Sequence, residues 1–170
     1  FGKASGASAL YCVLAERGII KKSKVNEYLK KYPLASTEVK GVVHSVGSIG
    51  HALPVAVGMA LGDRKRNVYV LLGDADVQEG TFYESLLFAK QHKLFNLHII
   101  VDRNRLQACD YTENILGITD SLLALSLIFP FISVNTIKGK GVDFMENDFT
   151  WHYKNLDKET YETAILSVSK

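Results

Sequence analysis

Two short polar segments of this sequence could together bind a cation. One segment, GDADVQEG, contains Asp74, and the other, VDRNRLQ, contains Asn104 thirty positions later. Each follows a continuous apolar run typical of a buried parallel strand, and the carboxyl ends of parallel strands meet at one edge of a sheet. A carboxylate, an amide oxygen and a backbone carbonyl such as that of Leu106 are hard oxygen ligands of the kind that Mg²⁺ prefers. We therefore predict a magnesium site formed by Asp74, Asn104 and Leu106.

The first segment also suits an anion. Gly73 and Ala75 are small enough to let a diphosphate group approach the turn, and the amides at the start of the next helix favour negative charge. The alternative interpretation of this Gly-Asp pair is an acidic turn at a strand end, which any Rossmann-like domain can contain. The pattern thus favours a diphosphate held beside the cation without requiring it.

The elements that must position these residues alternate between helices and strands. Apolar periodicity, a run of small residues and continuous β-branched runs predict helices at 7–17, 24–32, 51–62, 80–92 and 157–168, and strands at 67–72, 97–101 and 131–135. Ser23 is expected to cap the second helix, and residues 121–134 are expected to be buried core. The predicted fold class is α/β, a doubly wound and mostly parallel sheet with helices on both faces, in one domain over residues 1–170.

Composition argues against several kinds of partner. The chain has 170 residues, is 47% hydrophobic, and carries a net charge of +2 that is mixed along the sequence, so neither nucleic acid nor a membrane is an expected partner. Neither the glycine-rich nucleotide loops nor the nucleophile elbow of hydrolases occurs. Cys12 and Cys109 have no metal-ligand spacing. We expect both to be free thiols in a cytoplasmic protein.

The two polar segments resemble the Gly-Asp-Gly motif of thiamine diphosphate enzymes and its later Asn, in the version found in transketolases. Ala75 replaces the last glycine of that motif. A glycine-punctuated turn containing Gly47 and Ile49 resembles the family's turn, in which the backbone at these positions contacts the aminopyrimidine. Residues 4–16 and 136–152 resemble further transketolase segments. The resemblance implies the diphosphate-binding (PP-type) fold, with thiamine diphosphate and Mg²⁺ as cofactors.

The resemblance also implies roles for three more residues. Glu79 would belong to a glutamate network that links two cofactor sites across a dimer, although an acidic residue in the first turn of a helix is also favoured by the helix dipole. His152 would reach the diphosphate or the substrate, or else be a structural surface residue beside Trp151. His51 stands where the family usually has Gln, next to the turn that contacts the pyrimidine, and is a candidate cofactor-binding residue.

Two departures concern the substrate. Ser5 and Tyr32 stand where transketolases usually have histidines, which weakens the case for ordinary ketose phosphates and makes a modified sugar or another acceptor plausible. Lys138 and Lys140 could meet an anion or lie in a solvated loop.

The resemblance further implies that the catalyst is completed elsewhere. In transketolases a pyrimidine-binding domain supplies an essential glutamate, and no such domain is recognisable here. We expect the N-terminal subunit of a split transketolase, inactive alone, in a dimer of heterodimers with a C-terminal pyrimidine-binding subunit, acting on a sugar or sugar phosphate. We also expect it to lack N-terminal residues and a segment between about 108 and 130. The alternatives are a 2-oxo acid decarboxylase or carboligase that uses the same cofactor, and a degenerate, non-catalytic scaffold subunit.

Overall fold

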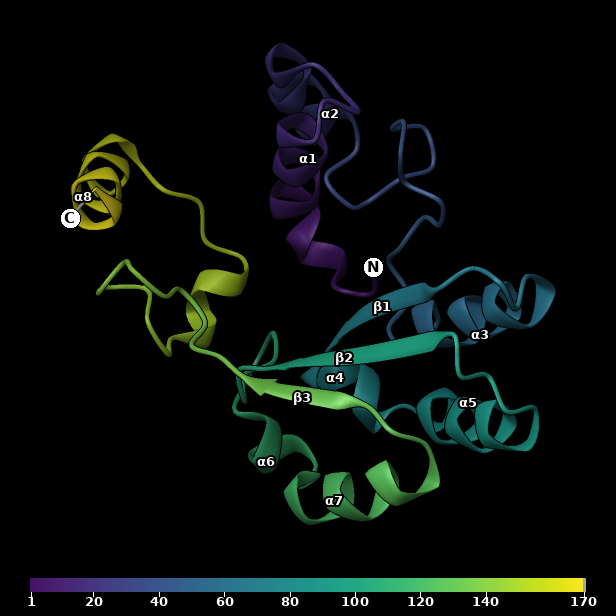
Figure 1. Cartoon of the computed structure of the whole chain (residues 1–170). Helices are drawn as coiled ribbons and strands as arrows, with labels where there is room; N and C mark the ends of the chain where they lie inside the picture. The colour runs from purple at the N-terminus through teal and green to yellow at the C-terminus, as the bar shows by residue number, and fades with distance from the viewer. Residues whose placement is uncertain (170) are drawn as a thin grey trace.

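A small parallel sheet organises the chain. The computed structural model describes residues 1–169, apart from the side chains of residues 119 and 120. Strands β1 (Val68–Gly73), β2 (Leu97–Arg103) and β3 (Ile132–Asn135) lie in the order β1-β2-β3, and both pairs are parallel (Figure 1). Because Gly73 pairs with Asp102 and Arg103 with Asn135, the carboxyl ends of all three strands lie at one edge.

Helices connect these strands and extend beyond them. They are α1 (Ala7–Glu16), α2 (Val25–Lys31), α3 (Ala52–Gly62), α4 (Asp74–Gln78), α5 (Gly80–Gln91), α6 (Thr112–Ile115), α7 (Thr119–Ile128) and α8 (Lys158–Val168), with 3₁₀ turns η1 (Ala4–Gly6), η2 (Lys22–Lys24) and η3 (Phe149–His152). Helices α3, α4, α5 and α7 lie on one side of the sheet, and α1 and α2 lie on the other (Figure 1). The fold is thus the α/β class predicted, with helices on both faces.

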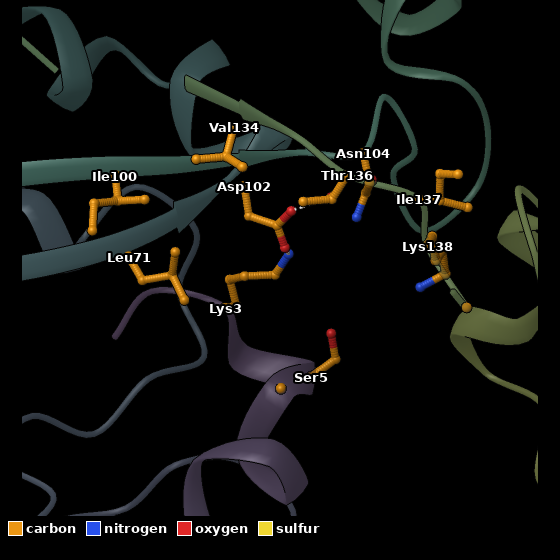
Figure 2. A pocket seen from close by; sticks show the side chains of 12 residues that line it. Lys3, Ser5, Leu71, Ile100, Asp102, Asn104, Val134, Thr136, Ile137 and Lys138 are labelled. Atoms are coloured by element: carbon orange, nitrogen blue, oxygen red, sulfur yellow. Dashed lines mark hydrogen bonds and ion pairs between the residues drawn. The ribbon is translucent and has the colours of Figure 1, made fainter. Parts of the chain in front are cut away.

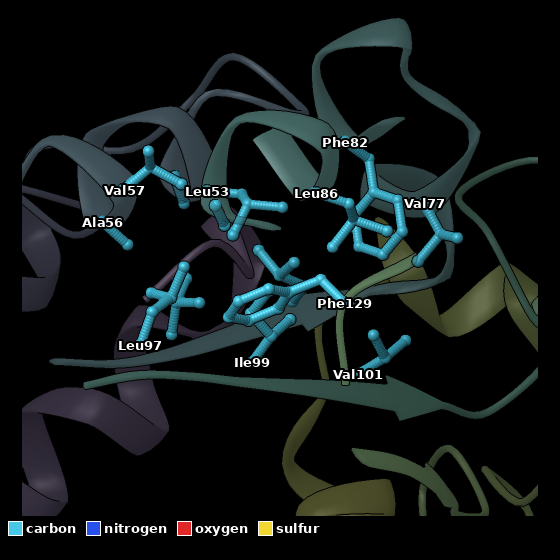
Figure 3. Close-up of a cluster of buried hydrophobic side chains, with 14 of the residues drawn as sticks. Leu53, Ala56, Val57, Val77, Phe82, Leu86, Leu97, Ile99, Val101 and Phe129 are labelled. Carbon is cyan, nitrogen blue, oxygen red and sulfur yellow. The ribbon is translucent and has the colours of Figure 1, made fainter. Parts of the chain in front are cut away.

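The main core lies between the sheet and helices α3, α5 and α7. Alternate strand residues point into it, among them Leu72 and Val101, and they meet Phe82 and Leu86 from α5 (Figure 3). All four side chains are at most 1% exposed. Each such side chain stabilises the fold by roughly 1.5–3 kcal/mol on burial, so this cluster holds β1 and β2 against the helices.

A second buried cluster holds the N-terminal helices together. Tyr11 on α1 is fully buried, and its hydroxyl donates to the carbonyls of Tyr32 (3.2 Å) and Leu34 (3.0 Å). The chain before α1 reaches the sheet, since the Gly2 amide donates to the Leu71 carbonyl at 2.7 Å. Residues 1–6 therefore pass directly over the carboxyl end of β1.

The sheet face away from the main core is only partly covered in the residues described. Tyr69, Ile132 and Val134 are 67%, 62% and 42% exposed there. Leu71 and Ile100 on the same face are partly buried. Parallel sheets are usually covered on both faces, so this surface is unusual for the fold.

The predicted helices and strands are present to within two residues at each end, with two differences. Ser23 caps nothing: a 3₁₀ turn precedes α2, and the α2 N-cap residue, Lys24, makes no side-chain cap bond. The expected core at 121–134 is only half buried, because α7 is a helix with one face on the core. Leu122 and Leu125 are buried, whereas Leu123 and Leu127 are 76% and 80% exposed.

The cysteines and the helix lengths agree with the composition. Cys12 and Cys109 are both free and exposed, as expected. Within residues 1–169, no helix has the length and apolar character needed to cross a membrane.

Candidate functional site

The ends of β1 and β2 meet at Asp74. This residue begins α4 directly after β1, and its side chain is 1% exposed. Its Oδ2 accepts hydrogen bonds from the backbone amides of Asn104 and Arg105, both at 3.0 Å. The Asn104 side-chain oxygen in turn accepts from the Leu106 amide at 2.9 Å. The structure thus brings the three predicted metal ligands into one hydrogen-bonded cluster, while their role as ligands stays a prediction.

A buried arginine shares this cluster. Arg103 is the last residue of β2 and donates from Nη1 to Asp74 Oδ1 at 3.0 Å, with its side chain 4% exposed. Its Nη2 donates to Glu113 Oε1 at 2.8 Å. Burial raises the pKa of Asp74 above its ordinary value, although the bond from the Arg105 amide and the charge of Arg103 oppose that rise. The carboxylate therefore depends on its donors to stay ionised.

These residues can contribute to a magnesium site. A carboxylate has about four acceptor positions, and protein donors use three of those on Asp74. One position remains for a cation, and the Asn104 side chain and Leu106 carbonyl are near by in the chain. In the part of the chain that the structure describes, no group of three or more His, Cys, Asp or Glu residues could hold a metal. A cation here would need phosphate oxygens and water to complete its coordination.

The turn that contains Gly47, Ile49 and Gly50, here called the glycine turn, is attached to the end of β1 by the Asp76 carboxylate. Its Oδ1 accepts from the Gly50 amide and its Oδ2 from the Gly73 amide, both at 2.8 Å, and the residue is 5% exposed. Thr81 also donates to the Gly50 carbonyl at 3.0 Å. Gly50 has φ +82°, and a Cβ there would lie 2.7 Å from Glu79 Cβ. The turn can therefore pack here only with glycine at this position.

A cleft of about 500 Å³ opens at the carboxyl edge of the sheet. Lys3 and Ser5 line it from the N-terminal segment, Asp102 and Asn104 from the end of β2, and Lys138 from the loop after β3 (Figure 2). The side chain of Asn104 points into the cleft (Figure 2). The hydrogen-bonded cluster of Asp74, Asn104 and Leu106, here called the strand-end cluster, therefore borders a space large enough for a small-molecule ligand.

The charges around the cleft act on one another. Burial alone would raise the pKa of Asp102, but hydrogen bonds from Lys3 and Thr136 bring it below its ordinary value. Burial, and then the charge of Lys3, lowers the pKa of Lys138. Burial and the charge of Lys138 lower the pKa of His152. Among the described residues that line the cleft, the carboxylate of Asp102 stands against the ammonium groups of Lys3 and Lys138, so the cleft favours an anion.

The remaining predicted site residues lie at the borders of these features. Gly47 and Ile49 are exposed in the glycine turn, with Ile49 51% exposed, and Glu79 is an exposed residue packed against that turn. His51 is exposed at the start of α3. His152, partly buried in η3, lies near enough to Lys138 to feel its charge.

The contacts of four residues around the site were not predicted. These residues are Lys3 and Asp102, which pair with each other, and Asp76 and Arg103. The spacing of Asp76, three residues after the strand-ending Gly73, is that of a capping box and could have indicated its role. No comparable signal pointed to the partners of Arg103.

Comparison with known proteins agrees with this geometry. A family model described as the thiamine pyrophosphate enzyme C-terminal TPP binding domain matches residues 24–116. The chain is 34% identical over 200 residues to an apulose-4-phosphate transketolase subunit from Actinobacillus succinogenes, covering 96% of this chain and 72% of that one. The chain belongs to the transketolase family of thiamine pyrophosphate enzymes. Thiamine diphosphate binding is thus supported by membership of the family.

Other members of the family extend the comparison. A 6-deoxy-6-sulfo-D-fructose transketolase subunit of Clostridium sp. is 26% identical, with 99% of this chain and 74% of that one covered. The structure of transketolase from Leishmania mexicana has a TM-score of 0.72 at 14% identity, covering 99% of this chain and 36% of that one, and shows the shared fold. The matched family model is named for a C-terminal domain, so the N-terminal position that we predicted for this subunit within a transketolase stays a prediction.

Proposed function

We propose that this chain is the diphosphate-binding subunit of a split transketolase, which uses thiamine diphosphate and Mg²⁺ to transfer a two-carbon ketol unit between sugars. The observation that carries this proposal is the convergence of the β1 end, the β2 end and the glycine turn, with Asn104 after β2 lining the cleft. The Asp74 carboxylate accepts a hydrogen bond from the Asn104 amide, and the Asp76 carboxylate accepts from the amides of Gly50 and Gly73. Two relatives are named as transketolase subunits, which supports two-carbon transfer over decarboxylation of a 2-oxo acid.

Each group in the site has a task in this proposal. When bound, thiamine diphosphate supplies the carbon nucleophile and Mg²⁺ neutralises its diphosphate. Asp74, Asn104 and the Leu106 carbonyl would hold the cation, and Gly73 and Ala75 would let the diphosphate approach. Gly47 and Ile49 would present backbone to the aminopyrimidine. Burial and the charge of Lys138 lower the pKa of His152, which favours its neutral imidazole, so one ring nitrogen can accept a proton while the other donates a hydrogen bond.

The substrate that we propose is a sugar carrying an anionic group. Lys3 and Lys138 line the cleft, and Ser5 lines it where the family usually has a histidine. The shorter serine leaves more room at this wall. Both relatives are named for anionic sugars, a phosphate in one and a sulfo-sugar in the other. A modified sugar with a phosphate or sulfonate group would fit this combination of space and positive charge.

A separate pyrimidine-binding subunit would complete the site. Apolar side chains remain exposed on α3 and α5, where Val55, Met59, Leu87 and Phe88 are 37%, 38%, 57% and 42% exposed. Apolar surface of this extent is typical of subunit interfaces. We propose that these helices contact other subunits in a dimer of heterodimers, and that Glu79 beside the glycine turn links the cofactor sites across it.

Calorimetric titration of the assembled subunits with thiamine diphosphate and Mg²⁺ tests the site. Asp74→Ala and Asn104→Leu should each abolish metal-dependent binding, because each removes a proposed ligand. Asn114→Leu is the matched control, since Asn114 is exposed and its side chain donates only to Asp110 among the contacts described. Binding by Asp74→Ala equal to that of the parent would show that the ligand assignment is wrong. A complex that binds no cofactor would instead indicate a non-catalytic scaffold.

A further inference from the structure

Two segments at the amino edge of the sheet concentrate positive charge. Residues 63–67 lead from α3 into β1, and residues 90–96 end α5 and lead into β2, at the opposite end of the strands from the cleft (Figure 1). Five of the 20 basic residues and one of the 18 acidic residues lie in these segments, so the rest of the chain has a net charge of −2. The five basic residues, here called the basic edge, are Arg64, Lys65, Arg66, Lys90 and Lys93.

The charges of the basic edge are available to a partner. All five residues are exposed, and none of them forms an ion pair within the part of the chain that the structure describes. Arg64 donates a hydrogen bond to a backbone carbonyl, that of His92, at 3.0 Å. Neighbouring positive charges repel one another. An anionic partner would therefore relieve a repulsion that the isolated chain contains.

The two segments are held together by Asn96. Its side-chain amide donates to the backbone carbonyls of Ala60, Asp63 and Arg66, at 3.0, 3.0 and 2.9 Å. Lys93 has φ +50°, in the region that favours glycine. Glycine would fit this turn with less strain, so the lysine is present at some cost in stability. Groups presented on a fixed frame lose less freedom when a partner binds.

A small apolar pocket adjoins the basic edge. Its volume is about 240 Å³, and its lining includes Phe95, Pro130 and Ile132. Phe95 belongs to the segment that contains Lys93 and is 81% exposed, and Ile132 is 62% exposed. The volume is below the roughly 300–1,000 Å³ of small-molecule pockets. The pocket therefore suits one apolar side chain rather than a metabolite.

We propose that the basic edge and the apolar pocket together bind an acidic polypeptide segment of a partner protein, which carries one large apolar side chain. The carboxylates of this segment would meet the basic edge, and its apolar side chain would enter the pocket beside Phe95. Complementary charge steers such a segment to the surface and fixes its position. Burial of the apolar side chain then adds affinity that charge alone would not provide.

A polypeptide accounts for both features better than a nucleic acid does. A single-stranded nucleic acid stacks successive bases on a series of aromatic faces. At this pocket Phe95 is exposed beside the aliphatic Pro130 and Ile132. Tyr69, the next exposed aromatic residue along the sheet, already stacks on His98 with the ring centroids 4.6 Å apart. An aliphatic lining with one free aromatic face favours a side chain as the occupant.

Fluorescence anisotropy with labelled peptides tests the role of the pocket. The full chain is titrated with a short peptide of glutamates around one phenylalanine, and with the same peptide carrying serine in place of phenylalanine. We expect the phenylalanine peptide to bind about tenfold more tightly, because its ring is removed from water. Phe95→Ala removes one wall of the pocket and should abolish this preference. Because Phe95 is exposed, the substitution should leave the fold intact.

The role of the charges is tested by a double variant. Lys65→Gln combined with Arg66→Gln should weaken binding of the phenylalanine peptide by about three- to thirtyfold, and should make it less sensitive to salt. Lys21→Gln combined with Lys30→Gln is the matched control. These two lysines are also exposed and form no ion pair among the contacts described, and they lie before and within α2. The control removes the same charge and should leave the affinity unchanged.

Several outcomes would overturn this inference. Equal affinity of the parent for the two peptides would show that the pocket is not used. Equal weakening in the two double variants would show that only net charge attracts the peptide. Tighter binding of an oligouridine would assign the edge to nucleic acid instead. These titrations contain no thiamine diphosphate, so their failure would leave the proposed function intact, and failure of cofactor binding would leave the peptide site intact.

Discussion

Replacement of Asp76 by alanine should uncouple the two halves of the site. Its carboxylate accepts from two backbone amides at 2.8 Å, that of the buried Gly50 on the glycine turn and that of the partly buried Gly73 at the end of β1. In Asp76→Ala both donors lose their partner, and the residue is too deeply buried, at 5% exposure, for water to replace it freely.

The expected cost follows from these two bonds. A hydrogen bond to a charged group contributes about 1.5–3 kcal/mol, so Asp76→Ala should lower the free energy of unfolding by about 3–6 kcal/mol. Asp76→Asn keeps one acceptor oxygen but turns an NH₂ group towards the other amide. The free energy of unfolding should therefore fall in Asp76→Asn by at least half as much as in Asp76→Ala. Domains have total stabilities of about 5–15 kcal/mol, so the alanine variant should be only marginally stable.

Urea denaturation followed by circular dichroism measures this loss. Hydrogen exchange measured by NMR should also show that the Gly50 and Gly73 amides exchange faster in Asp76→Asn than in the parent. Asp63→Ala is the control, because Asp63 is exposed and its carboxylate accepts one described bond, from the Lys65 amide at 3.0 Å. It should cost less than about 1 kcal/mol. Equal losses of unfolding free energy in Asp76→Ala and Asp63→Ala would show that the two hydrogen bonds to Asp76 contribute nothing special to stability.

Three further results are expected. Gly50→Ala should lose about 2 kcal/mol or more in urea denaturation, because φ is +82° and the new Cβ would lie 2.7 Å from Glu79 Cβ; a loss below that of an exposed substitution would contradict the packing described. Lys138→Met should raise the pKa of His152 in an NMR titration, since a nearby positive charge disfavours the imidazolium, and an unchanged pKa would show that the two groups do not interact. The purified chain alone should cleave no sugar donor until a pyrimidine-binding subunit is added, with light scattering reporting the assembly; turnover by a monomer would refute the split-enzyme proposal.

The strands and their common edge could be predicted because they depend on short-range patterns. Continuous β-branched runs mark β1 and β2, and parallel pairing then requires their carboxyl ends to meet. The contact between Asp74 and the Asn104 amide follows from that topology alone. The same reasoning located the glycine turn in sequence, but its attachment to the strand end depends on a side-chain contact 26 positions away in the chain, from Asp76 to Gly50.

The burial of Arg103 could not be predicted because the predicted strand was too short. A strand ending at Val101 leaves Arg103 in a loop, where an arginine is expected to be solvated. The observed β2 extends through Arg103, so side-chain alternation carries the residue to the core face. The half-buried α7 was missed for a related reason. Apolar residues on both sides of a helix look like core in the sequence, although only one side meets the sheet.

The partly open sheet has a consequence for how much of this protein a cell can hold. Tyr69, Ile132 and Val134 are exposed on one face, and β1 and β3 are the outer strands of the sheet described. Open strand edges beside apolar side chains promote self-association, and chains that expose them are removed by chaperones and proteases. We expect the level of this chain to follow the supply of whatever covers that face. Expressed in excess over the partner that covers this face, the chain should accumulate as aggregates or be degraded. The synthesis rate of the chain relative to that of its partner would then set its abundance more than its own stability does.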